Sequence, residues 1–96
     1  MEIIWDSAKN EILKRERNVS FEEVLDILLN DKELDLIENP TRDGQTCYIV
    51  CLNDYVHVVP AVINERNQII LKTIFPSRKY NAIYKGQTNE KEKNKT

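Results

Sequence analysis

Two β-rich runs, residues 45–52 and 55–63, are separated only by Asn53 and Asp54, and this pair of runs constrains the fold more than any other feature. Valine, isoleucine and tyrosine favour strands, and an Asn-Asp dipeptide tolerates the positive φ angles of a two-residue turn. The pattern therefore predicts a β-hairpin. Because Pro60 has no N–H to give to a ladder, we expect a bulge or an unpaired donor position beside it.

Helical patterns precede this hairpin. Asp6 is a candidate N-cap for a helix over about residues 7–16. Ser20 followed by Glu23 has the spacing of a capping box, so a second helix is expected over about residues 21–30. The apolar residues of the second helix recur at i, i+3, i+4 and i+7, which gives it one buried side made of Phe21, Val24, Leu25 and Leu28.

Three further strands are expected, over residues 3–5, 34–37 and 68–75. Strict alternation divides the last of them into two faces, one with Ile69, Leu71, Thr73 and Phe75 and the other with Ile70, Lys72 and Ile74. Ser77 is then expected to cap a short last helix that closes at Gly86.

The order of these elements predicts a single α+β domain over residues 1–86. Two N-terminal helices pack on one face of a curved antiparallel sheet, the other face stays partly uncovered, and a short C-terminal helix follows. Residues 87–96 contain no apolar side chain and are expected to form a disordered polar tail. No secretory signal pattern and no run near the ~18 apolar residues of a membrane span is present, so we expect a cytoplasmic protein.

The two cysteines, Cys47 and Cys51, lie on one predicted strand, which holds their Cα atoms about 13 Å apart, too far for a disulfide. A tetrahedral metal site needs four ligands, and His57 is the only histidine that could join them. We therefore expect buried, inert thiols and neither a metal nor a cofactor.

Charge is distributed unevenly along the chain. Residues 1–39 carry 5 Lys/Arg against 11 Asp/Glu, a net charge of −6, whereas residues 66–86 carry 5 Lys/Arg and no acid, a net charge of +5. This contrast predicts one surface that meets an anion such as a phosphate, and another that repels anions or meets a basic partner.

Several short motifs resemble the BrnT branch of the RelE/ParE-like bacterial toxins. They are Trp5-Asp6-x-x-Lys9 followed by a basic helix, Val19-Ser20-Phe21-Glu22-Glu23, an Asp43-Gly44 turn before a long strand, and Ile74-Phe75-Pro76-Ser77-Arg78-Lys79 before the last helix. The chain departs from the family at two places. Glu16-Arg17-Asn18 stands where Lys-His-Gly is usual, and Asn18 can adopt the left-handed conformation of that glycine. Cys47 stands where the family often has Arg.

The resemblance implies a RelE-like fold and a small metal-independent ribonuclease that cleaves mRNA and inhibits translation and growth. It also implies a cognate antitoxin, of the ribbon-helix-helix DNA-binding type, that forms a hetero-oligomer with the toxin. Two alternatives stay open: a non-nucleolytic toxin of the same fold, such as a gyrase poison, and a protein-interaction module whose basic patch binds an acidic peptide.

RNA cleavage without a metal needs a base for the 2′-hydroxyl, cations for the charge on phosphorus, and an acid for the departing 5′-oxygen. Arg78 is the candidate phosphate ligand, because its planar fork holds two phosphate oxygens. Lys72 is a candidate base or second phosphate ligand, and an outward lysine on an amphipathic strand is the alternative. Tyr84 is the candidate proton donor.

Further residues are candidates for RNA binding: Lys79, Arg66, Arg42 and Tyr80. Tyr80 and Tyr84 are four residues apart and share a helix face, so they either stack on a base or pack against the sheet. His57 shares a strand face with Tyr55 and Val59, which favours a structural role over catalysis.

Overall fold

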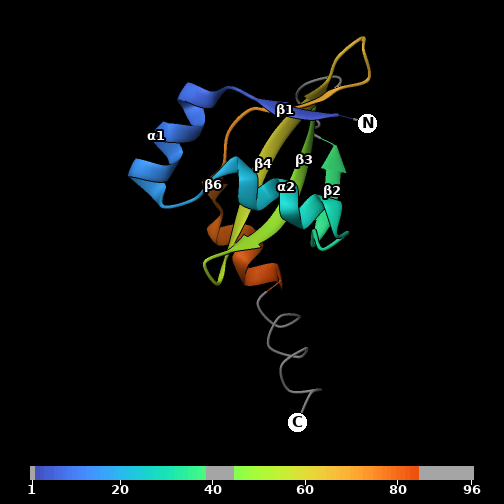
Figure 1. Ribbon diagram of the computed structural model, residues 1–96. Coiled ribbons are helices and arrows are strands. Elements are labelled where there is room, and N and C mark those ends of the chain that lie inside the picture. Colours follow the sequence, from blue (N-terminus) through green and yellow to red (C-terminus); the bar gives the residue numbers. More distant parts are fainter. Residues whose placement is uncertain (1, 39–44, 85–96) are drawn as a thin grey trace.

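The computed structural model describes residues 2–38 and 45–84, which form a sheet with helices on both faces (Figure 1). The strand order is β1-β5-β4-β3-β2, and β6 also pairs with β4. The elements are β1 (Ile3–Trp5), α1 (Ser7–Arg17), α2 (Phe21–Leu29), β2 (Asp35–Glu38), β3 (Gln45–Leu52), β4 (Tyr55–Ile63), β5 (Ile69–Leu71) and β6 (Phe75–Pro76). A last helix covers 78–84. The turn around residues 39–44, the helix end at Gly86 and the tail at 87–96 lie outside the described residues.

The predicted caps start and end the first two helices. Asp6 accepts hydrogen bonds from the N–H groups of Ala8 and Lys9, at 2.8 and 3.2 Å. Asn18 ends α1 in the left-handed conformation, with φ 56° and ψ 37°. The Ser20 hydroxyl accepts the N–H of Glu23 at 3.2 Å, which is one half of a capping box, and donates to Glu23 Oε1 at 3.1 Å. The starts of both helices and the left-handed Asn18 are therefore confirmed.

Asn10 connects the two helices, a role that the sequence pattern did not indicate. Its side chain is 2% exposed and lies on α1. Its Oδ1 accepts the backbone N–H of Phe21 at 2.8 Å, and its Nδ2 donates to Glu22 Oε1 at 2.8 Å. The amide thus satisfies one of the free N–H groups at the start of α2.

We expect Asn10→Ala to lower the free energy of unfolding by about 1–3 kcal/mol, because it leaves the buried N–H of Phe21 without an acceptor. Urea denaturation measures the loss. Glu11→Ala is the matched control on the same helix, since it removes only an exposed ion pair with Lys14 and should cost much less than the loss of Asn10. Equal losses in the two variants would contradict this role of Asn10.

The predicted hairpin is present as β3 and β4. Asn53 and Asp54 form its turn with φ angles of 54° and 60°. The ladder pairs Leu52 with Tyr55 and continues to Gln45 and Val62. This hairpin is the centre of the sheet, because β2 pairs with β3 and both β5 and β6 pair with β4.

The segment from β5 to β6, which pairs with β4, contains a bulge opposite Pro60, where one was expected. Leu71 pairs with Ala61 and Phe75 pairs with Val58, so three residues, 72–74, face two residues of β4. The Lys72 N–H donates to the Pro60 carbonyl at 2.8 Å. The N–H and C=O of one strand residue point to the same side. The Pro60 carbonyl points to the bulge, so the N–H that proline lacks would have pointed there as well.

The bulge overturns the predicted faces of the last strand. The chain does not form one strand over 68–75, and its alternation shifts by one residue between β5 and β6. Ile74 is fully buried in the same core cluster as Ile69 and Leu71, whereas Phe75 is 38% exposed. A prediction from strict alternation is wrong here because an extra residue exchanges the two faces.

One further expectation about the sheet, that it is antiparallel throughout, is wrong. The sheet is mixed, because β1 pairs parallel with β5, with Ile3 opposite Ile69. The face away from α1 and α2, which was expected to stay partly uncovered, is covered in part by the last helix, since Tyr80 and Tyr84 pack against a second cluster of Cys47, Ile49, Val56 and Val58. Neither contact has a local signal, because the partners are far apart in sequence.

No helix in the described ranges is long and apolar enough to cross a membrane.

Candidate nucleic-acid interface

Four exposed cationic residues lie in, or bond to, the segment 72–79 that runs beside β4, and we call them the basic strip: Arg17, Lys72, Arg78 and Lys79. Lys72 lies in the bulge, where its N–H donates to the Pro60 carbonyl at 2.8 Å. Ser77 precedes Arg78, and its N–H donates to the Val56 carbonyl at 3.0 Å. Pro60 and Val56 are four residues apart on one strand, so these two anchor points lie about 13 Å apart.

Arg17 completes the strip from a different part of the chain. Its guanidinium Nη1 donates to the carbonyl of Ile74, which lies between Lys72 and Arg78 in sequence. The last turn of α1 is basic, with Lys14, Arg15 and Arg17. This basic turn was visible in the sequence. Its contact with Ile74 was not, because Arg17 and Ile74 are 57 residues apart and no local pattern indicates that they meet.

The strip keeps its cations available to an outside anion. Within residues 2–38 and 45–84, Lys14 is the only cationic side chain with a carboxylate within 4 Å, and its partners are Glu11 and Glu22. Its hydrogen bond with Glu11 raises the pKa of Lys14. Lys79 instead lies over the ring of Tyr80, with its Nζ 5.3 Å from the centroid. The strip therefore presents positive charge that no described carboxylate neutralises.

The last helix is held in place by its cap and by two tyrosines. Ser77 Oγ accepts the N–H of Tyr80 at 3.2 Å, which confirms the predicted cap. Tyr80 and Tyr84 have ring centroids 6.4 Å apart and pack on the second core cluster. The Tyr84 hydroxyl donates to Asp35 Oδ2 of β2 at 2.7 Å. Of the two predicted roles for these rings, packing against the sheet is the one seen, and it positions Arg78 at the start of the helix.

The Tyr84–Asp35 hydrogen bond couples two titrating groups. It raises the pKa of Tyr84 to about 12 and, with the N–H of Leu36, lowers the pKa of Asp35. A raised phenol pKa stabilises the fold below the ordinary pKa of 10, and the contribution is lost as pH rises toward 12. A lowered carboxyl pKa stabilises the fold above the ordinary pKa of 3.8, and this contribution is lost as pH falls through the lowered value.

We therefore expect Tyr84→Phe to raise the pKa of Asp35 toward its ordinary value, because the strongest hydrogen bond to its charged form is removed. A titration of the Asp35 carboxyl by NMR measures the change. Tyr80→Phe is the matched control, because Tyr80 packs beside Tyr84 and its hydroxyl has no partner among the described residues. An unchanged Asp35 pKa in the Tyr84 variant would contradict the coupling.

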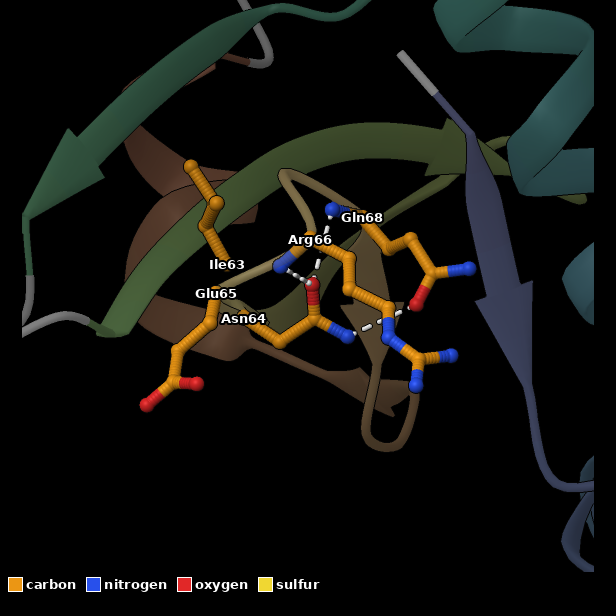
Figure 2. Close-up of a pocket in the computed structure, with 5 residues that line it drawn as sticks. All are labelled: Ile63, Asn64, Glu65, Arg66 and Gln68. Atoms are coloured by element: carbon orange, nitrogen blue, oxygen red, sulfur yellow. Dashed lines mark hydrogen bonds between the residues drawn. The ribbon is translucent and has the colours of Figure 1, made fainter.

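Arg66 lies beyond the Lys72 end of the strip, far from Arg78. Its turn lies at the other end of β4, where Asn64 Oδ1 accepts the N–H groups of Arg66 and Gln68 at 3.0 and 2.9 Å. Figure 2 shows the open hollow of about 500 Å³ at this turn, with Ile63 and Glu65 also in its lining. Asn64 is eight residues beyond Val56, or about 26 Å along the strand from the Arg78 end of the strip, and four residues, or about 13 Å, beyond Pro60 at its Lys72 end. Arg42 lies outside the described residues.

The side chains most often involved in chemistry elsewhere have structural positions here. His57 is 6% exposed, and its Nδ1 lies 2.9 Å from the Tyr55 carbonyl. Since a carbonyl only accepts, Nδ1 carries the proton. Burial raises the pKa of both free thiols, Cys47 and Cys51, which keeps them protonated. No group of three or more potential metal ligands is found in the described part of the chain.

The fold and the site thus define a small α+β domain with an exposed basic strip beside its last helix. Comparison with known proteins adds no assignment: no family model, no curated protein and no solved structure matches this chain.

Proposed function

We propose that this chain is the toxin of a type II toxin–antitoxin system, a metal-independent endoribonuclease with a RelE-like fold that cleaves mRNA in the cytoplasm. The observation that carries the proposal is the basic strip, which is exposed and has no described carboxylate partner. The motifs that resemble BrnT-type toxins, above all Ser77-Arg78-Lys79, supply part of this same strip. The α+β architecture is compatible with that family.

The strip is suited to the phosphate of a single-stranded RNA. In the proposed reaction, the 2′-oxygen loses its proton and attacks phosphorus, and the bond from phosphorus to the 5′-oxygen breaks. Arg78 holds two phosphate oxygens through its guanidinium and stabilises the charge that develops on them. Lys72 acts either as the base for the 2′-hydroxyl or as a second phosphate ligand. Lys79 and Arg17 bind neighbouring phosphates of the strand.

The departing 5′-oxygen needs a proton donor. Tyr84 is the sequence candidate, but its hydroxyl donates a hydrogen bond to Asp35, and the raised pKa makes release of the proton harder. Tyr84 can act as the acid only if substrate binding breaks that hydrogen bond. The proposed role of Tyr80, to stack on a base, likewise requires its ring to leave the packed cluster.

The proposed partner is an antitoxin encoded by a neighbouring gene, with an acidic or amphipathic segment that covers the basic strip. Opposite charges on the two surfaces would speed their association. The resulting hetero-oligomer would hold the toxin inactive because the phosphate ligands are then occupied.

Incubation of the purified protein with single-stranded RNA in the presence of a chelator tests the proposal. We expect cleavage products with cyclic phosphate and 5′-hydroxyl ends, together with growth arrest on induction that co-expression of the neighbouring gene relieves. If the RNA stays intact and gyrase-dependent DNA breaks form, the protein is a gyrase poison and the ribonuclease hypothesis is wrong. Intact RNA and DNA, with an acidic peptide bound at the strip, would indicate the interaction module instead.

A further inference from the structure

A second charged surface lies at the opposite edge of the sheet, where α2 leads into β2 (Figure 1). Residues 22–38 contain seven acids and one lysine, a net charge of −6. Among the described residues, only Glu22 of these acids has a cation within 4 Å. Of the remaining six carboxylates, Asp35 bonds to Tyr84 of the last helix, and the other five produce a negative field that the described part of the chain does not neutralise.

Two large apolar side chains are exposed within this acidic region. Leu29, the last residue of α2, is 70% exposed, and Leu36 of β2 is 52% exposed. Leu36 is the Cα partner of Tyr48, so both side chains lie on the sheet face that carries α2. Isolated leucines on a surface are common, but two of them beside an unneutralised acidic region form a surface with a specific chemistry.

Glu33, in the connection between these two leucines, provides an independent observation. Its Oε1 is buried and is the one buried side-chain oxygen or nitrogen in the described residues without a hydrogen-bond partner. Glu33 is also near Tyr48, since its charge contributes to the raised pKa of that phenol. A carboxylate oxygen that lacks a donor is unfavourable, and because Oε1 is shielded, a cationic donor from outside relieves the penalty only when the Glu33 side chain turns outward.

We propose that this surface, the acidic corner of Leu29, Glu33, Leu36 and Tyr48, binds a basic amphipathic helix of a partner protein. Lysine or arginine from that helix pairs with Glu33 and the surrounding carboxylates, and its apolar side covers the two leucines. A helix fits better than an added strand, because the Leu36 N–H at the β2 edge already donates to Asp35 Oδ1 at 2.8 Å. The site lies away from the basic strip and does not depend on RNA cleavage.

A titration of the isotope-labelled protein with designed peptides tests this proposal by NMR. The probe is an amphipathic leucine–lysine helix of about 15 residues, and its leucine–glutamate counterpart is the charge control. We expect the amides of the acidic corner to shift only with the lysine peptide. Leu36→Ser should weaken the binding about tenfold, and Glu33→Gln should weaken it several-fold.

Two variants outside the corner are matched controls. Ile83→Ser removes an apolar side chain that is 56% exposed on the last helix, and Glu65→Gln neutralises an exposed acid at the far turn. Both should bind the lysine peptide within about twofold of the parent protein. The proposal is overturned if the shifts lie outside the corner or if the glutamate peptide binds equally well. It is likewise overturned if an alternating leucine–lysine strand binds more tightly, or if a second copy of this chain occupies the corner in sedimentation experiments.

Discussion

Arg78→Ala should lower the rate of RNA cleavage by about 10²–10³-fold and abolish growth arrest, while the protein stays folded. The expected size is that of removing one preorganised group that stabilises developing charge in a transition state. Arg78 is exposed in the first turn of the last helix, so its loss removes no core contact. Single-turnover cleavage of a defined RNA measures the rate, and circular dichroism verifies the fold.

Two arginine variants separate a specific role of Arg78 from a general effect of charge. Arg78→Lys keeps the charge but loses the planar fork, so its cleavage rate should lie between those of Arg78→Ala and the parent protein. Arg66→Ala removes the same charge about 26 Å away along β4. It should weaken RNA binding by a few-fold at most and leave the cleavage step unchanged. Cells that express Arg78→Ala and still arrest growth as fully as the parent would exclude Arg78 from catalysis.

Phe21→Ala should destabilise the domain by about 3–5 kcal/mol, a large part of the roughly 5–15 kcal/mol that keeps a small domain folded. Phe21 is 0% exposed and its ring centroid lies 5.7 Å from that of Trp5, at the point where α2 meets the core. Truncation leaves a cavity between helix and sheet. Chemical denaturation measures the loss, and the amount of soluble protein on expression should fall with it.

Phe75→Ala is the matched control for this substitution. Phe75 is 38% exposed on β6, so the same change should cost about 1 kcal/mol or less. Similar losses for the two phenylalanines would show that burial in this core does not determine their contributions.

The parts of the fold that local chemistry decides were predicted well. Caps at Asp6 and Ser20 depend on side chains that bond to N–H groups two or three residues away, so a short window contains all the information. The same holds for the turn at Asn53 and Asp54, whose two positive φ angles depend on residue type alone. The basic segment 66–86, which contains Arg78 and Lys79, was also visible from composition.

The candidate site required long-range contacts that no local pattern encodes. Arg17 joins the strip only because the end of α1 reaches the Ile74 carbonyl, and Arg66 is excluded only because β4 carries its turn to the far end of the sheet. The sheet face away from α1 and α2 is covered in part by the last helix, whose Tyr84 donates a hydrogen bond to Asp35, 49 residues away.

The sequence by itself determined where the helices begin, where the central hairpin turns and which segments are charged, because these properties depend on residues a few positions apart. The tertiary structure decided the parallel pairing of β1 with β5 and the shift of faces at the bulge beside Pro60. It also decided which cations share a surface. These features depend on how distant segments bury a common core, and the free energy of that burial belongs to the whole chain and to no single window of it.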